Sequence, residues 1–368
     1  MTNRSSDLDD SRKKGAFYGW YIVAALFFAS FLAIGLRHGF GVFVKTWEED
    51  WGVTTAAISL AASIGVLCNG LSQPIGGWLA DRYGGRPVLV FSLTVMALST
   101  IAVSTVSSVF GLIILYGVLV SFAAGGVSHP AMAVVIARWF DRNRGAAMSI
   151  LVAGGSVGGL VVVPFLSYAL VEFGWRAAWV IIGLLALGFG VPLLLLIVRN
   201  KPSELGMQID GEQHDESNRE LPQSSAQYIG PDFVNKWHQA LNSKPIWQLS
   251  FGYFVCGITT LAVAVHFVRW AVSEDITEAT AALAFGALMF VNALGVLVVG
   301  VLSDRFQRKN LLGTVYLIRG LAFISLIVVP GDQAIWAFAV IGGMSWLATV
   351  PLTASLTADV YGVRNLGT

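Results

Sequence analysis

Long apolar runs constrain this chain more than any other feature of its sequence. A membrane-spanning helix needs roughly 20 predominantly apolar residues, because lipid offers no hydrogen-bond partner to an exposed backbone group. Ten stretches meet this length, and they are continuous rather than alternating, which excludes the pattern of a β-barrel. The expected spans are Tyr18–Val44, Thr54–Ala80, Val88–Val106, Phe110–Ile136, Ala146–Val171, Arg176–Val198, Ile246–Trp270, Glu278–Leu302, Leu311–Val329 and Ala334–Ala358.

Composition agrees with an all-α membrane protein whose main partner is the lipid bilayer. Of 368 residues, 55% are hydrophobic and 12% charged, about half the charged share of a soluble domain. The net charge of +1 shows no basic excess that would indicate nucleic acid. Neither a phosphate-binding loop, nor metal-ligand spacing, nor a catalytic Ser-His-Asp grouping is visible, so we expect no cofactor and no enzymatic activity.

The distribution of basic residues predicts the orientation of the spans. With the N-terminus in the cytoplasm, 18 of the 23 Lys and Arg residues fall in inside loops, 3 in outside loops and 2 within spans. Cytoplasmic loops carry such an excess of positive charge. We therefore expect a multi-pass protein of the cell (inner or plasma) membrane with a cytoplasmic N-terminus.

A long polar stretch divides the spans into two groups. Residues 199–245 are mixed in charge and poor in periodic apolar positions, which indicates a cytoplasmic linker. The predicted organisation is a cytoplasmic tail (1–16), an N-terminal six-helix bundle (17–198), the linker, and a C-terminal bundle with four helices (246–368).

The two groups of spans are related by an internal repeat. The residues after span two, Gly-Trp-Leu-Ala-Asp-Arg-Tyr-Gly-Gly-Arg from Gly77, align without gaps with Gly-Val-Leu-Ser-Asp-Arg-Phe-Gln-Arg-Lys from Gly300. The segments that follow span four (from Arg142) and span ten (from Arg364) also correspond. Internal symmetry of this kind is typical of secondary transporters.

Both copies resemble the signature of the major facilitator superfamily, a tight cytoplasmic turn between helices two and three. Gln307 in the second copy replaces a glycine of the signature. The resemblance implies twelve helices in two pseudo-symmetric halves, so the chain is expected to lack the last two. The matching residues are Gly77, Asp81, Arg82, Gly84 and Arg86 in the first copy and Gly300, Asp304, Arg305 and Arg308 in the second.

The signature residues are predicted to form a cytoplasmic latch. Asp81 lies at a helix end, where it can pair with Arg residues of the loop and hold the halves closed on that side. The alternative is a topological anchor whose basic residues face anionic lipid.

The segment from Trp139 to Gly155 resembles the signature of monocarboxylate porters and of the oxalate:formate antiporter-like group. Phe140, Arg144, Ala147 and Gly154 are among the matching residues. This resemblance implies a small carboxylate as substrate and adds Arg144 to the candidate gate residues.

Arg37 is the leading candidate for binding such an anion. All 22 Asp and Glu residues lie in tails, loops or near span ends, whereas Arg37 is expected in the outer third of span one. A buried charge without a counter-ion is costly, and a guanidinium binds carboxylates in bidentate fashion. The alternative is an arginine that snorkels to the outer headgroups.

Other polar residues within the spans complete the candidate site. His38, His129 and His266 titrate near neutrality and are the available proton carriers, although each could equally be a packing residue. His266 and Arg269 lie one turn apart near the outer end of span seven, and Asn292 is the one strongly polar residue in the middle of span eight.

These patterns together predict a secondary transporter that moves a small organic anion, a monocarboxylate or dicarboxylate, by proton-coupled symport or anion exchange. We expect it to act as a monomer on a small-molecule solute. Two alternatives stay open at this point: an exporter of neutral or cationic amphiphiles, and a non-transporting short form.

The predicted orientation can be tested with topology reporters. A reporter fused within the linker Arg199–Pro245 should be cytoplasmic, and one fused between Val106 and Phe110 should be external, because positive charge is retained inside. Fluorescence and phosphatase activity of the fusions measure the two sides. Opposite labelling would reverse the side of every loop.

Overall fold

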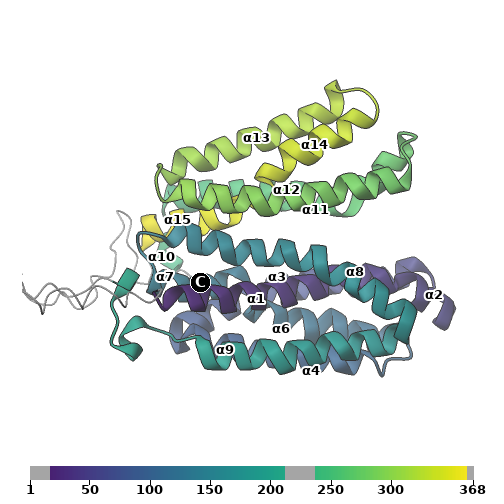
Figure 1. The fold of residues 1–368 in the computed structure, drawn as a ribbon, viewed down its shortest axis with the longest axis horizontal. Coiled ribbons are helices and arrows are strands. Elements are labelled where there is room, and N and C mark those ends of the chain that lie inside the picture. The colour runs from purple at the N-terminus through teal and green to yellow at the C-terminus, as the bar shows by residue number, and fades with distance from the viewer. Residues whose placement is uncertain (1–16, 212–236, 363–368) are drawn as a thin grey trace, which may run out of the picture.

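The computed structural model describes residues 17–211 and 237–362, and these form helices and turns without a strand. Figure 1 shows two groups of roughly parallel helices, α1–α9 and α11–α15. They contact each other mainly through α8 and α12, and α15 also contacts α7 and α8. The predicted tail, the middle of the linker and the repeat of the Arg142 segment after residue 362 lie outside the described residues. The all-helical class expected from the sequence is confirmed.

The first group contains the spans predicted as one to six. Its hydrophobic core is one continuous cluster that includes Leu26, Leu89 and Trp179. The elements are α1 (Gly19–His38), η1 (Gly39–Phe43), α2 (Val44–Trp51), α3 (Thr55–Tyr83), α4 (Gly85–Val103), α5 (Val109–Leu112), η2 (Ile113–Val120), α6 (Ser121–Gly126), α7 (His129–Trp139), α8 (Arg144–Leu185), η3 (Ala186–Gly190) and α9 (Val191–Ile197).

The second group has a separate core around Phe267, Leu288 and Phe338. Short helices of the linker, η4 (Pro202–Leu205), η5 (Ile209–Gly211) and α10 (Trp237–Ala240), come before it in the chain. The long elements are α11 (Lys244–Ser273), α12 (Glu278–Ser303), α13 (Arg308–Val328), α14 (Asp332–Ser345) and α15 (Thr349–Tyr361).

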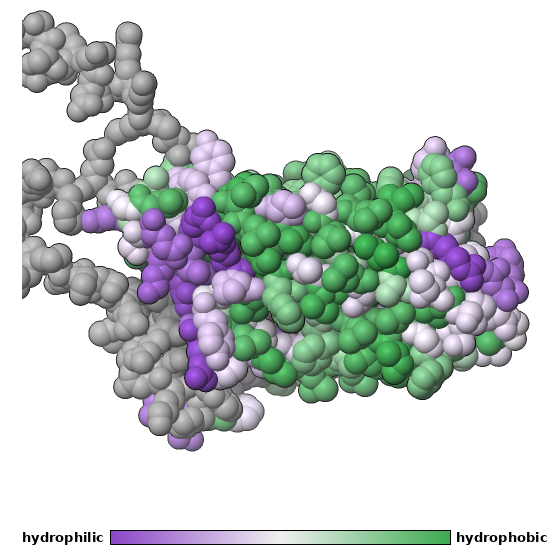
Figure 2. Space-filling view, turned by 90° about the horizontal axis from the view of Figure 1, so that it is seen from below, coloured by the Kyte–Doolittle hydropathy of each residue, from purple (hydrophilic) through white to green (hydrophobic). Residues whose placement is uncertain are grey.

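Within the described residues, nine helical segments are long and apolar enough to cross a membrane. One of them, Arg144–Ile197, has 54 residues and is interrupted at Gly174, whose φ of 79° lies in the left-handed region. The chain turns back there, so this segment supplies two of the ten predicted spans. Figure 2 shows the apolar belt that results, with hydrophilic residues gathered at the two ends of the bundle.

The fourth and tenth spans are both broken near the middle, at nearby positions of the repeat. Between α6 and α7 the backbone becomes extended at Ser128 (ψ 165°), and α14 and α15 are separated by residues 346–348. The fourth span also contains a π-helical stretch, η2. Interrupted helices at matching positions of two repeats are a typical feature of transporter binding regions.

Polar side chains satisfy the backbone groups that the break in the tenth span exposes. Arg319 of α13 donates to the carbonyl oxygens of Ser345 (2.7 Å) and Trp346, and Asn292 accepts from the N–H of Leu347 (2.9 Å). Arg319 also donates to the hydroxyl of Thr259 (3.3 Å) and is only 3% exposed. The charged guanidinium of Arg319 therefore stabilises the break between α14 and α15.

Replacing Arg319 should destabilise the second group of helices. Arg319→Met leaves two buried carbonyl oxygens without a donor, which should lower the free energy of unfolding by about 3 kcal/mol. Arg319→Lys reaches fewer acceptors, so an intermediate loss is expected. Unfolding by denaturing detergent, followed by tryptophan fluorescence, measures the effect. An unchanged midpoint for Arg319→Met would contradict this role.

Candidate functional site

Polar residues that join the two helix groups gather at the end of the bundle where both signature turns lie. We call this end the signature end; it holds the turns after α3 and after α12. Asp304, the acid of the second copy, accepts from the backbone N–H groups of Gly145 and Ala146, both at 2.8 Å. Asp304 thus caps the N-terminus of α8 in the opposite group, where a carboxylate also complements the helix dipole.

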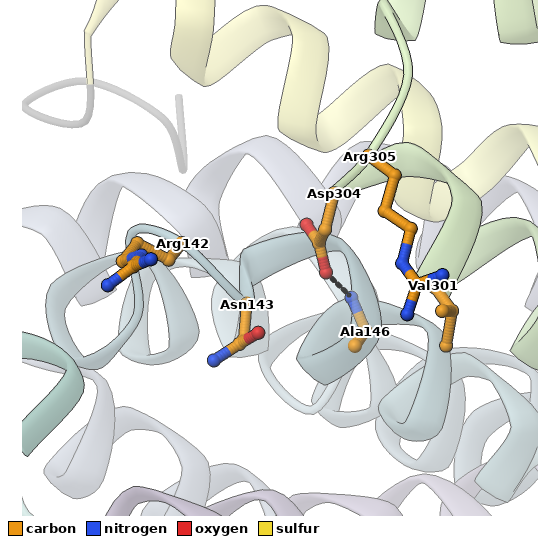
Figure 3. Close-up of a pocket in the computed structure, with 6 residues that line it drawn as sticks. All are labelled: Arg142, Asn143, Ala146, Val301, Asp304 and Arg305. Carbon is orange, nitrogen blue, oxygen red and sulfur yellow. Dashed lines mark hydrogen bonds between the residues drawn. The ribbon is translucent and has the colours of Figure 1, made fainter.

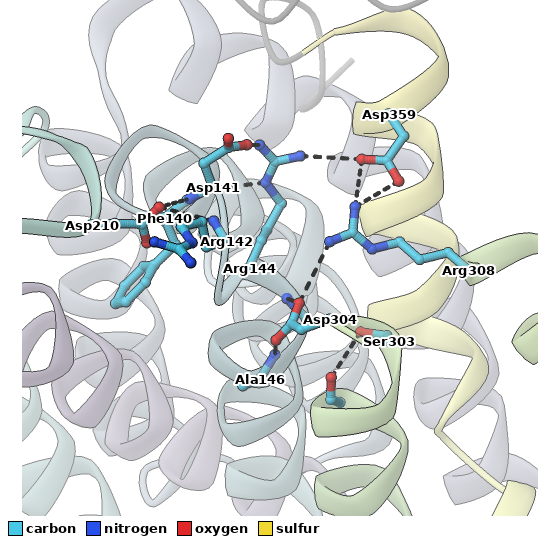
Figure 4. A network of polar contacts seen from close by, with 12 residues as sticks. Phe140, Asp141, Arg142, Arg144, Ala146, Asp210, Ser303, Asp304, Arg308 and Asp359 are labelled. Atoms are coloured by element: carbon cyan, nitrogen blue, oxygen red, sulfur yellow. Dashed lines mark hydrogen bonds and ion pairs between the residues drawn. The ribbon is translucent and has the colours of Figure 1, made fainter. Parts of the chain in front are cut away.

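A chain of ion pairs extends this contact, as Figure 4 shows. Arg308 contacts Asp304 at 3.5 Å and binds Asp359 of α15 at 2.5 Å. Asp359 also lies 3.6 Å from Arg144, which pairs with Asp141 at 2.8 Å. Arg144 is 2% exposed, so opening this end of the bundle would leave its charge without part of its compensation.

The first part of the linker supports the loop that carries Asp141. Asp210 accepts from the backbone N–H groups of Asp141 (3.0 Å) and Arg142 (2.8 Å) through one carboxylate oxygen. Its φ of 58° is unusual for a residue other than glycine, and here the two hydrogen bonds stabilise it. The linker is therefore part of the polar network at the signature end.

A cavity of about 420 Å³ opens beside the Asp304 cap. Figure 3 shows Arg142 and Asn143 on one side of it and Arg305 and Val301 on the other. Basic and amide groups thus surround the capped helix end, which places Arg305 of the second signature next to the contact between the groups.

In the first signature copy, the arginines of the turn contact a backbone carbonyl and an aromatic ring. Arg86 donates to the carbonyl oxygen of Leu195 (2.6 Å), and the guanidinium of Arg82 lies 5.3 Å from the ring centroid of Trp78. Gly84 has a φ of 94° and leaves no room for a Cβ beside Asn200. These residues fasten the turn to the end of span six and to neighbouring aromatic rings.

Asp81 and Gly77 lie on α3 at the signature end. Gly77 is buried, and Arg138 of α7 donates to the backbone carbonyl of Asp81 (3.0 Å). Gly300 of the second copy packs directly on Ser149 of α8. The contact between the helix groups thus involves the second copy of the signature.

A second polar cluster lies within the first group, around Arg37. Its guanidinium donates to Asn69 Oδ1 (3.0 Å), and the same oxygen accepts from Gln73 Nε2 (3.1 Å). Asn69 also donates to the carbonyl oxygen of Ser121 (3.3 Å), beside the π-helical stretch. The hydroxyl of Tyr116 donates to the backbone carbonyl of Arg37 (3.3 Å). The partners of this arginine are therefore neutral in the described part of the chain.

The helix that carries Arg37 is longer than predicted. It continues from Gly19 to Trp51, past the expected end at Val44, and Arg37 is residue 19 of its 33. The extension is held by aromatic packing, in which Trp47 stacks on Trp51 at 5.7 Å and Phe40 on Tyr116 at 4.4 Å. The amphipathic end carried too few apolar residues to be recognised as part of a span.

Two of the predicted histidines lie near Arg37, whose charge acts on both imidazoles. His38 is exposed, and its ring packs over Gly159 of α8. A Cβ added at Gly159 would lie 2.8 Å from the Nδ1 of His38. His129 begins α7 immediately after the break, and its Nε2 is buried without a hydrogen-bond partner among the described residues. The structure thus brings Arg37, His38 and His129 into one region.

The candidates of the second group are not assembled in the same way. His266 is exposed on α11, and the side chain of Arg269 lies outside what the structure describes. Asn292 is fully buried and donates to Ser156 Oγ of α8 at 2.8 Å. With its oxygen bound to Leu347, Asn292 is engaged in contacts between helices.

Several residues of both clusters were missed by sequence reasoning. Asp359 was counted as a span-end acid and Asp210 as part of a linker. Only the fold brings Asp359 to Arg144 and Asp210 to the backbone of Asp141 and Arg142. Asn69 and Gln73 carried a usable signal, because two amides four residues apart in an apolar span share one helix face. Asn69 and Asn292 also lie at equal distances before Gly77 and Gly300, so extending the repeat alignment backwards pairs them.

Comparison with known proteins places this arrangement in a family context. The model of the Major Facilitator Superfamily matches residues 26–368. An uncharacterised MFS-type transporter, YcxA, of Bacillus subtilis is 25% identical over 363 residues, covering 95% of this chain and 82% of the relative. Human monocarboxylate transporter 11 is 24% identical (94% and 71% covered), and the oxalate:formate antiporter of Oxalobacter formigenes 23% (95% and 79%).

Solved structures show the same fold. The proton:xylose symporter XylE superposes with a TM-score of 0.62 at 15% identity, covering 95% of this chain and 85% of the symporter. A bacterial homologue of the human lysosomal transporter Spinster gives 0.60 at 19% identity, covering 96% and 78%. The expected two-group helical architecture is thereby confirmed at the level of the fold.

Removing the charge of Asp304 should loosen the signature end. Asp304→Asn loses the charge–dipole contact with α8 and weakens the ion pair with Arg308. Together the two losses should destabilise the closed arrangement of the signature end by about 1–2 kcal/mol. In a variant without native cysteines, labelling of Ser149→Cys by a membrane-permeant maleimide should accelerate roughly tenfold. Asp332→Asn, which removes an exposed charge at the start of α14, should change nothing. Equal labelling rates in all backgrounds would contradict the latch.

Proposed function

The chain belongs to the Major Facilitator Superfamily and is a multi-pass membrane transport protein, and we propose that its solute is a small organic anion. The proposed substrate is a monocarboxylate or dicarboxylate, moved by alternating access. An ion or counter-solute gradient would supply the energy.

The observation that carries this proposal is the state of Arg37. A cation within a span costs several kcal/mol unless it is compensated. Its hydrogen-bond acceptor among the described residues is the amide oxygen of Asn69, which carries no charge. Arg319 meets the same cost by binding backbone carbonyl oxygens. An anionic solute would supply the negative charge that the described partners of Arg37 lack.

The geometry around Arg37 supports a site for a small carboxylate. Asn69 holds one guanidinium nitrogen, and Tyr116 fixes the backbone at the end of α1. A side chain held in this way loses little further entropy on binding, while the remaining N–H groups can form a bidentate contact with a carboxylate. Relatives named as monocarboxylate transporters and as an oxalate:formate antiporter support the same solute class.

Coupling to protons would use the histidines near Arg37. His38 is exposed and His129 adjoins the break in span four, so either imidazole could take up a proton as the anion binds. Anion exchange without a proton is the alternative for the same site. The signature end would face the cytoplasm, in keeping with the excess of basic residues on that side, and the Asp304 latch would then be the inner gate of a monomeric transporter.

The anion site can be tested by changing the shape of the cationic group at position 37. Arg37→Lys keeps the charge but loses the planar fork, so the affinity for a carboxylate should fall by about 1.5–3 kcal/mol, roughly 10- to 100-fold. Arg37→Gln should do at least as much harm. The measurement is initial-rate uptake of a panel of small carboxylates into proteoliposomes, with the folded fraction checked for each variant.

A matched control separates the site from the net charge. Arg176→Gln removes an equal charge from an exposed position above the ring of Trp175, and it should leave affinity unchanged. If well-folded Arg37→Gln protein keeps full affinity for anions, the anion site is refuted and an exporter of neutral or cationic amphiphiles becomes the better explanation.

A further inference from the structure

The two helix groups meet along a stripe of α8 and α12 that begins at the signature end. Gly145 packs on Ser303 and Gly300 packs on Ser149, with no space for a Cβ at either glycine. Further along, Val152 belongs to one buried cluster with residues of α12. The residues of this stripe, Gly145, Ser149, Val152 and Ser156 on α8 and Asn292, Val296, Val299, Gly300 and Ser303 on α12, are all buried.

The stripe ends at a buried hydrogen bond near the middle of both spans. Asn292 Nδ2 donates to Ser156 Oγ at 2.8 Å, and the two residues are 0% and 4% exposed. One turn further on α8, Leu160 is already 43% exposed. Among the described residues, the Ser156–Asn292 bond is thus the last buried polar contact between α8 and α12 in this direction.

Asn292 cannot rotate freely to give up this bond. Its Oδ1 accepts from the backbone N–H of Leu347 at 2.9 Å, within the break of the tenth span. The amide oxygen is therefore held by the second group, and the NH2 must point toward α8. The donor direction is fixed by the same backbone break that Arg319 stabilises.

Contacts at the two ends of the stripe differ in how easily they can be broken. Asp304 lines the cavity, and the side chains of Arg308 and Asp359 are 14% and 28% exposed, so water can replace their contacts when they separate. The Ser156–Asn292 pair has no such access, and breaking it would expose an amide and a hydroxyl to an apolar interface. An unpaired buried polar group costs more than the hydrogen bond itself contributes.

We propose that the Ser156–Asn292 hydrogen bond is the fixed point at which α8 and α12 stay joined while the signature end separates. Asn292 is then a positioning residue for the conformational change and does not bind solute. The inference rests on the alternating access of the proposed function but not on the nature of the solute. Opening should be small next to Ser156 and grow toward Gly145.

Thiol labelling at two depths of the stripe tests this. In a variant without native cysteines, Val152→Cys reports opening one turn from the bond, and Ser149→Cys reports opening two turns away. Ser156→Ala removes the bond but leaves the Asp304 latch intact. We expect it to accelerate maleimide labelling of Val152→Cys roughly fivefold and that of Ser149→Cys much less, because the second site already opens with the bond in place.

Two further variants make the result specific. Asn292→Ala should accelerate labelling of Val152→Cys at least as much as Ser156→Ala. Ser30→Ala removes an equally buried hydroxyl from α1, beside Gly155 of the same helix α8, and should leave both rates unchanged. No solute is added, so the outcome does not depend on the anion site.

The proposal is overturned if Ser156→Ala accelerates both reporters equally, since the bond would then be one more gate contact. It is also overturned if labelling of Val152→Cys stays unchanged, because the bond would then hold nothing in place. An equal effect of Ser30→Ala would show a general loosening of α8, and the fixed point would again be refuted.

Discussion

A membrane interior without hydrogen-bond donors or acceptors is the constraint from which this structure follows. Any backbone group freed by a helix break, and any charge placed within a span, needs a partner supplied by the protein. The break in the tenth span is satisfied by Arg319 and Asn292, and the carbonyl of Ser121 beside the π-helical stretch is satisfied by Asn69. These three polar residues are therefore placed where the helices are irregular.

The same constraint explains how polar contacts help to join the two helix groups. Asp304 supplies a carboxylate to the N-terminus of α8, whose first N–H groups have no partner within the helix. Because these groups lie at the end of the bundle beside a cavity, water can replace the contact. A latch of this kind is stable when closed and can still open, which a dry apolar contact of equal strength would not allow as readily.

Glycine and serine let the backbones of the two groups approach closely enough for these contacts. Gly145 and Gly300 face Ser303 and Ser149 with no space for larger side chains, which brings Asp304 within reach of α8. In lipid, helices associate through close packing and buried hydrogen bonds because no hydrophobic driving force favours their contact. The Ser156–Asn292 bond adds a directional contact to the close-packed part of this interface.

Much of the fold was determined by the sequence alone, because span length, loop charge and the repeat of the signature each reflect a local requirement. The apolar runs correspond to the helices of the structure, and both signature turns could be recognised from short motifs. The partners of the polar residues were decided only by the tertiary structure: Asp359 reaches Arg144 and Arg308 from another helix, and Asp210 reaches the loop after α7 from the linker. Arg37 was visible as a buried charge, but its neutral partner Asn69 lies on a different span. A hydrogen bond between distant segments depends on how helices cross and at what depth, and the amino-acid pattern of a single span contains neither quantity.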